Sequence, residues 1–135
     1  MEQLEILFEQ FTGEKPLSTE ELPSSGSNRR YFRIQSKNRT LIGAQGTCVD
    51  ENIAFMTIAK HFRERGLNVP QVYSCSEDNI YYLQEDLGND TLYSRITQGR
   101  ESGKYSPKER ELLLKTIRKL PEIQFEGAKG LDFSV

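Results

Sequence analysis

A short polar turn followed by two arginines is the part of this sequence best suited to bind an anion. Residues 24–28 read SSGSN, a run of five small or turn-forming residues. Small residues let backbone N–H groups approach the oxygens of a phosphate, and a turn directs several of them to one side. An ordinary hairpin turn has the same composition, so both interpretations stay open. The candidate phosphate-binding residues of the turn are Ser25, Gly26, Ser27 and Asn28.

Arg29 and Arg30 come directly after the turn. The planar guanidinium group matches a phosphate in charge and in geometry. Side chains alternate between the two faces of a strand, so only one of these arginines can face inward. We expect it to be Arg30, because the apolar residues Phe32 and Ile34 have the same parity. A solvent-exposed charge pair at the start of a strand is the alternative.

Glu51 is an acidic residue that could orient such an arginine. It lies in the first turn of a helix that we expect Asp50 to cap, and it could pair with Arg30. An acidic side chain in the first turn also interacts favourably with the helix dipole. That simpler role explains Glu51 equally well.

The other residues with catalytic or metal-binding chemistry form no recognisable site. His61 is the single histidine and lies in the charged stretch KHFRER, which is typical of an exposed helix face. Cys48 and Cys75 lack the spacing of metal ligands, so we expect two free thiols in a reducing cytoplasm. We therefore predict no metal site within this chain.

The composition fits one ordinary domain of 135 residues, of which 36% are hydrophobic and 28% are charged. The net charge of −2 creates no general attraction for nucleic acid or anionic lipid. Strand aromatics could form a stacking platform for bases, but alternation explains them better as sheet residues. No apolar run reaches membrane-spanning length, and the N-terminus does not read as a signal peptide. We expect a cytoplasmic protein that binds neither membrane nor nucleic acid.

The elements that position these residues are predicted from apolar periodicity and turn signals. The predicted order is a helix over residues 2–12, a meander of two or three strands over 20–46, a helix from 50 to Gly66, extended segments at 69–73 and 80–83, a polar mobile loop over 97–106, and a helix from Pro107 that breaks at Pro121. This order predicts an α+β fold with a twisted antiparallel sheet packed on one main helix, and extra helices at both ends.

Three segments, in this order and spacing, resemble the N-terminal lobe of aminoglycoside-phosphotransferase-type kinases. They read SGSNRRYFRI, FMTIAKHFRERGLNVPQVYS and YYLQEDLG. Within that family, this chain is most similar to bacterial anomeric kinases of N-acetylmuramate and N-acetylglucosamine. The similarity lies in the motif RRYFR and in the motif LEDLG, which reads LQEDLG in this chain. The resemblance covers residues 20–92 well and the last helix weakly.

The resemblance implies a kinase-like fold in which residues 1–87 form the nucleotide-binding lobe and residues 88–135 form the hinge and the start of the second lobe. It implies ATP and magnesium as cofactors, and transfer of the γ-phosphate to a hydroxyl of a sugar or aminosugar. In the family, the second lobe carries the catalytic Asp and the metal ligands. No such constellation follows residue 92, so we expect a truncated chain that is inactive alone.

The resemblance also implies how adenine is held. The carbonyl of Glu85 accepts from the amino group of adenine, the N–H of Leu87 donates to its ring, and Gly88 permits a bend. A strand that ends in a turn is the plainer alternative. We expect the turn at Gly26 to overhang the backbone from Glu85 to Leu87, leaving a slot for adenine.

The third strand departs from the kinase pattern. Protein kinases place a lysine here, bonded to the α- and β-phosphates, but residues 40–46 read TLIGAQG. Either an arginine of the preceding strand has taken over this role or the role is lost. The second possibility makes the chain a non-catalytic, pseudokinase-like binding or regulatory module.

Overall fold

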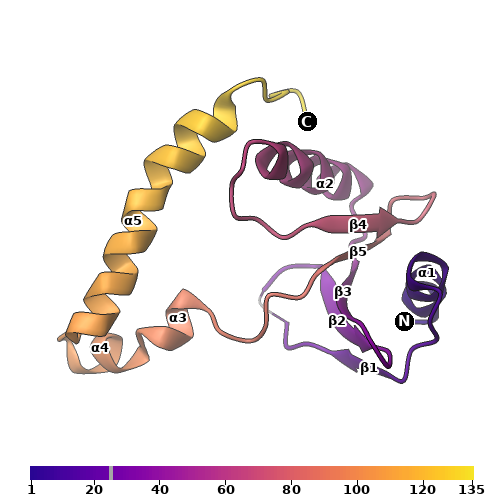
Figure 1. Cartoon of the computed structure of the whole chain (residues 1–135), viewed down its shortest axis with the longest axis horizontal. Helices are drawn as coiled ribbons and strands as arrows, with labels where there is room; N and C mark the ends of the chain where they lie inside the picture. Colours follow the sequence, from indigo (N-terminus) through magenta and orange to yellow (C-terminus); the bar gives the residue numbers. More distant parts are fainter. Residues whose placement is uncertain (25) are drawn as a thin grey trace. The chain divides into compact units, whose positions relative to one another are not determined.

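The computed structural model describes residues 1–24 and 26–135, and the chain divides into two compact units. The first comprises Met1–Asp86 with Asp132–Val135, and the second comprises Leu87–Leu131. The predicted α+β class is confirmed, with a five-stranded antiparallel sheet in the first unit (Figure 1). This architecture is consistent with a kinase-like N-terminal lobe. Over the residues described, no helix combines the length and the apolar character needed to cross a membrane.

The first unit follows the predicted order of elements, with the third strand of the meander now defined. Its elements are α1 (Glu2–Thr12), β1 (Ser18–Glu21), β2 (Arg30–Gln35), β3 (Thr40–Gln45), α2 (Val49–Glu64), β4 (Val72–Cys75) and β5 (Tyr81–Glu85). The strands lie in the order β1-β2-β3-β5-β4, and each neighbouring pair is antiparallel. The polar turn that contains Gly26 therefore connects the edge strand β1 to β2.

Helix α1 closes one face of the sheet. Its apolar positions recur at helical spacing, so they form one stripe that can be buried. The buried cluster on this face contains Leu4, Leu7, Phe8, Phe32, Ile34, Leu41 and Leu83. Gly13 ends the helix with φ 72, a left-handed conformation that glycine adopts without strain.

Helix α2 packs on the opposite face, where its Phe55 ring lies 5.5 Å from that of Tyr82. Alternation along β3 assigns the faces. A Cβ on Gly43 would lie 3.0 Å from Leu4, so Gly43 faces α1, and its neighbours face α2. Both faces of the sheet are therefore buried, each by its own helix.

The second unit contains α3 (Leu92–Arg95), α4 (Thr97–Ser102) and α5 (Pro107–Ala128). The predicted loop over residues 97–106 is wrong for its first part, which forms α4. The carboxylate of Glu109 explains the difference, because it accepts hydrogen bonds from the N–H groups of Gly99 (3.0 Å) and Ser106 (2.7 Å). Ser106 and Glu109 form a capping box at the start of α5.

The predicted break at Pro121 is also wrong, because α5 continues to Ala128. A proline inside a helix removes one N–H and presses on the carbonyl four residues earlier. An exposed helix can absorb that by bending. Glu122 follows immediately and pairs with Lys119 at 2.9 Å, which supports the helix across the proline.

Candidate functional site

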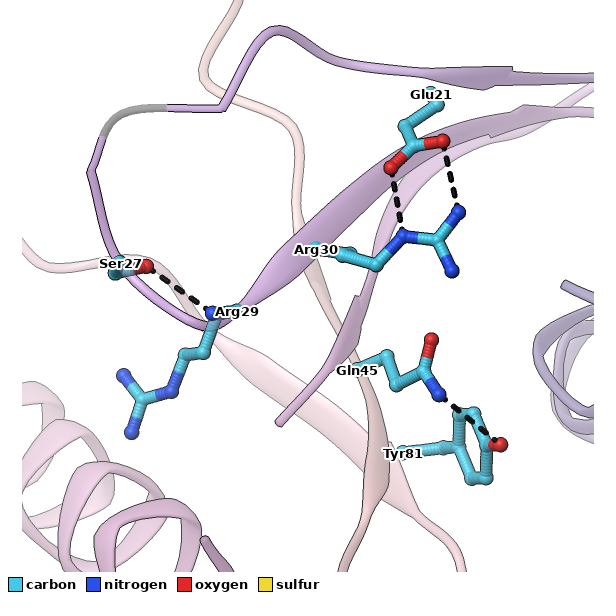
Figure 2. Close-up of polar contacts among 6 residues, drawn as sticks. All are labelled: Glu21, Ser27, Arg29, Arg30, Gln45 and Tyr81. Atoms are coloured by element: carbon cyan, nitrogen blue, oxygen red, sulfur yellow. Dashed lines mark hydrogen bonds and ion pairs between the residues drawn. The ribbon is translucent and has the colours of Figure 1, made fainter. Parts of the chain in front are cut away.

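The side chains of Arg29 and Arg30 diverge at the start of β2 (Figure 2). Arg30 forms a bidentate ion pair with Glu21 of β1, with Nε–Oε1 and Nη2–Oε2 distances of 2.7 and 2.9 Å. Its side chain is 55% exposed. The prediction that Arg30 faces inward and pairs with Glu51 is therefore wrong. As predicted, Arg30 is on the same face of the sheet as Phe32. That face is covered by α1, and Arg30 lies at the end of the face that α1 leaves exposed.

Arg29 instead has the position that was predicted for Arg30. Its Nη2 lies 4.0 Å from the carboxylate of Glu51, and its guanidinium carbon lies 5.5 Å from the ring centroid of Phe55. The side chain is only 20% exposed, and its Nε is buried with no hydrogen-bond partner among the described residues. Leaving a buried donor unsatisfied is costly, which makes Arg29 a candidate to bind an anion.

A cavity of about 100 Å³ adjoins Arg29. It brings together residues of the polar turn and the first turn of α2, and it is lined by Ser27, Asn28, Arg29, Gly46, Thr47, Cys48 and Glu51. Three of the predicted site residues, Ser27, Asn28 and Glu51, therefore share one cavity. Ser25 lies outside the described residues.

Within the polar turn, Gly26 has a conformation that only glycine accepts readily. Gly26 has φ 83, in the left-handed region. A Cβ built on Gly26 would meet no atom within 4 Å, so backbone conformation and not crowding favours glycine here. The hydroxyl oxygen of Ser27 accepts a hydrogen bond from the N–H of Arg29 at 3.2 Å, which connects the turn to β2.

Strand β5 ends at Glu85, which is anchored on the side of β4. Its N–H donates to the carbonyl of Gln71 at 2.8 Å, and its carboxylate accepts from the N–H of Gln71 at 3.2 Å. The same carboxylate lies 3.5 Å from Nη1 of Arg63. Leu87, the other predicted adenine-binding residue, is 65% exposed and begins the second unit.

Asp86, the residue after β5, is anchored from the side of β2 and β3. Its two carboxylate oxygens accept from Nε and Nη2 of Arg33 at 2.7 and 3.0 Å, and each side chain is 14% exposed. The hydrogen bonds that Arg33 donates to the Asp86 carboxylate raise the pKa of Arg33, which therefore stays charged. Sequence reasoning missed both residues, although each lies in a segment that resembles the kinase family.

The expected overhang of the Gly26 turn above Glu85 is not found. Arg30, next to the turn, is level with Gln45 and, across β3, with Tyr81 at the start of β5. Glu85 lies four residues further along, which is about 13 Å at a rise of about 3.3 Å per residue. The turn and the exit from β5 are at opposite ends of the strands, so a ligand that contacts both must be elongated.

The β3 residues that face α2 between these ends are Ile42 and Ala44, and neither carries a charge. A cation on this face must come from β2 or from the residues just before it. Arg33 is engaged by Asp86, and Arg29 retains an unsatisfied donor. Arg29 is therefore the better candidate to replace the kinase lysine.

One further reactive side chain, the thiol of Cys48, lines this cavity. Cys48 and Cys75 are free, as predicted. Burial raises the pKa of Tyr82, so its phenol stays neutral. Among residues 1–24 and 26–135, no three His, Cys, Asp or Glu side chains gather as metal ligands.

The five-stranded antiparallel sheet and its helices are consistent with a kinase-like N-terminal lobe. The chain is 32% identical over 107 residues to the N-acetylmuramate/N-acetylglucosamine kinase of Neisseria meningitidis serogroup B. The alignment covers 76% of this chain and 30% of that kinase, so the chain spans about a third of its relative. No protein-family model matches the chain. The similarity supports a sugar-kinase-like relationship.

Proposed function

We propose that this chain is the nucleotide-binding lobe of an ATP-dependent kinase that phosphorylates a hydroxyl of a sugar or aminosugar. The observation that carries the proposal is the cavity at Arg29. There the largely buried side chain of Arg29, whose Nε has no hydrogen-bond partner among the described residues, meets a small-residue turn and the first turn of a helix. The similarity to a sugar kinase supports the choice of acceptor.

At the phosphate end, Arg29 donates to phosphate oxygens, and its guanidinium lies beside the carboxylate of Glu51. The hydroxyl of Ser27 and backbone N–H groups of the turn contribute further donors. The N-terminal end of α2 adds a favourable partial positive charge. ATP would supply the phosphoryl group, and the magnesium ion would be held through phosphate oxygens together with groups outside this cavity.

At the other end, the carbonyl of Glu85 and the N–H of Leu87 recognise adenine. The N–H of Glu85 is already bonded to Gln71, so the carbonyl is the group of Glu85 assigned to the ligand. A groove completed by one lobe alone buries little of a nucleotide. We expect this chain to bind ATP with a dissociation constant of about 1 mM or weaker, and to show no phosphoryl transfer.

Backbone amide shifts during a titration with Mg-ATP test the proposal. We expect shifts confined to residues 26–30, 46–52 and 84–88. The Arg29→Gln variant should lose the shifts in the first two segments. Arg39→Gln, an exposed change in the β2–β3 turn, should keep them all. Shifts spread over the whole chain, no shifts up to about 10 mM, or saturable micromolar binding would each contradict this function.

A non-catalytic, pseudokinase-like module is the second candidate, and one observation favours it. Ile42 and Ala44 occupy the α2-facing positions of β3 where kinases carry their lysine. The gene sequence downstream of the codon for Val135 separates the two candidates. A catalytic Asp motif followed by a metal-binding Asp favours the enzyme, and its absence there favours the module.

A further inference from the structure

Two segments that resemble the kinase family, RRYFR and LQEDLG, meet in space through one ion pair. Arg33 of β2 and Asp86, the residue after β5, are 53 positions apart in the sequence. They are joined by two parallel hydrogen bonds of 2.7 and 3.0 Å. Bidentate geometry of this kind fixes orientation as well as distance. The pair thus constrains the direction in which the chain leaves the sheet.

We propose that Arg33 and Asp86 are positioning residues for the adenine base. In this proposal, the pair holds the backbone beyond β5 so that the carbonyl of Glu85 and the N–H of Leu87 form a rigid edge before ligand arrives. The inference rests on the proposed function, because it specifies how the adenine end of that site is organised.

The place of the pair in the sheet supports this role. Arg33 is directly opposite Ile42 of β3, which is opposite Gln84 of β5. The side chain of Arg33 therefore reaches across β3 to Asp86, two residues beyond Gln84 and on the same face. The last ladder partner of β5 is Glu85, opposite Leu41. Beyond Glu85 no pairing between the described strands holds the backbone. The next residue, Asp86, is held instead by its contact with Arg33.

The burial of the pair separates it from surface ion pairs. Arg30–Glu21 has almost the same bidentate geometry, yet about half of each side chain is exposed, against 14% for both Arg33 and Asp86. Water competes less for a largely buried pair, and removing one partner leaves the other charge uncompensated. The Arg33–Asp86 pair can therefore maintain one backbone direction, which an exposed pair cannot do reliably.

A preformed edge has a specific consequence for ligand preference. Ordering a flexible backbone on binding weakens affinity, by roughly tenfold for one residue. That loss applies only to ligands that use the edge. Weakening the pair should therefore reduce binding of ATP, and leave binding of inorganic triphosphate at Arg29 unchanged.

The first measurement is made without ligand, on the complete 135-residue chain. Backbone order parameters from nitrogen-15 relaxation are compared among the unmodified chain, Arg33→Gln, Asp86→Asn and the control Arg39→Gln. We expect the order parameters of Leu87 and Gly88 to fall from about 0.85 to below about 0.6 in the first two variants only. The order parameter of Leu83 should stay unchanged. Unchanged values at Leu87 and Gly88, or an equal fall at Leu83, overturn the proposal.

The second measurement compares Mg-ATP with magnesium tripolyphosphate by amide shift titration. We expect ATP binding to weaken about tenfold in Arg33→Gln and tripolyphosphate binding to change less than about twofold. Equal weakening of both ligands, or of neither, contradicts the positioning role. Arg33→Lys retains the charge but not the fork, so it should fold and give an intermediate loss.

Failure of the proposed function has a different signature. An unmodified chain that binds tripolyphosphate and ATP equally, or binds neither, contradicts the nucleotide-binding function. The order parameters then still decide whether the pair fixes the exit from β5.

Discussion

The side chain of Asn52 occupies the space that a Cβ on Gly46 would need. Asn52 is fully buried, and its Nδ2 donates to the carbonyls of Gly46 and Asn79, each at 2.8 Å. A Cβ on Gly46 would lie 2.2 Å from its Oδ1. One amide of α2 thus ties the end of β3 to the turn that leads into β5. Because Gly46 also lines the cavity at Arg29, this contact helps to shape the phosphate end of the site.

Replacing Gly46 by alanine should destabilise the first unit by about 1–3 kcal/mol or more, because Asn52 is held by two hydrogen bonds and cannot retreat. Gly43→Ala is the matched control. Its Cβ would lie 3.0 Å from the terminal methyl groups of Ile34 and Leu4, which can rotate away. We expect the smaller loss there. Urea unfolding measures both, and an equal loss in the two variants contradicts the explanation.

Asn52→Ala should also destabilise the protein, because two carbonyls lose their hydrogen-bond donor. Each carbonyl left buried and unsatisfied should lower the free energy of unfolding by about 1–3 kcal/mol. The same change removes the oxygen that obstructs a Cβ on Gly46. The double variant with Gly46→Ala should therefore lose less stability than the two single losses added together. Strict additivity in a double-mutant cycle would show that the two residues do not compete for this space.

Much of the sheet could be predicted, because its alternation and turn signals are local. The strands at 30–35 and 40–45 and the helix at 49–64 agree with their predictions to within one or two residues. Strand β1 was predicted only as a possible third strand. Its sequence STEE is almost wholly exposed, so it carries no apolar alternation, and it is defined by pairing with β2.

The site was harder to predict, because it depends on which helix covers which face. Alternation along the strand correctly predicted that Arg29 and Arg30 lie on opposite faces of the sheet. Apolar neighbours identify the inward face, however, only when a single face of the sheet is buried. Here α1 buries the face of Phe32 and α2 buries the other, so parity could not tell which arginine faces the cavity. The pair of Arg33 with Asp86 joins residues 53 positions apart, which no local pattern reveals.

The exchange of roles between the two arginines can be tested directly. Arg29→Gln should weaken tripolyphosphate binding about tenfold or more, since it removes the positive charge beside the cavity. Arg30→Gln should weaken it less than about twofold, because Arg30 is exposed and engaged by Glu21. Amide shift titrations of both variants measure the difference. The opposite order of effects would restore Arg30 to the site and remove Arg29 from it.

The second unit should lose stability in acid through Glu109. Hydrogen bonds from the backbone N–H groups of Ser106 and Gly99 lower the pKa of this carboxyl below its usual 4.5. A group whose pKa is lower in the folded state stabilises that state above its unfolded pKa. The stabilisation is lost as the pH falls through the folded pKa. Protonation of Glu109 should therefore release the start of α5 and the backbone of α4 together.

Comparison with Glu109→Gln isolates this contribution. At pH 7 the variant should exchange the amide protons of Gly99 and Ser106 faster than the unmodified chain, because a neutral amide accepts these hydrogen bonds more weakly than a carboxylate. The difference should start to shrink as the pH falls below the unfolded pKa of about 4.5. It should disappear only below the lowered pKa of the folded carboxyl, where the unmodified side chain is also neutral. Hydrogen exchange of these two amides, corrected for the intrinsic pH dependence of exchange, measures the effect. A difference that is constant from pH 7 to pH 3 would mean that the charge of Glu109 does not hold α4 against α5.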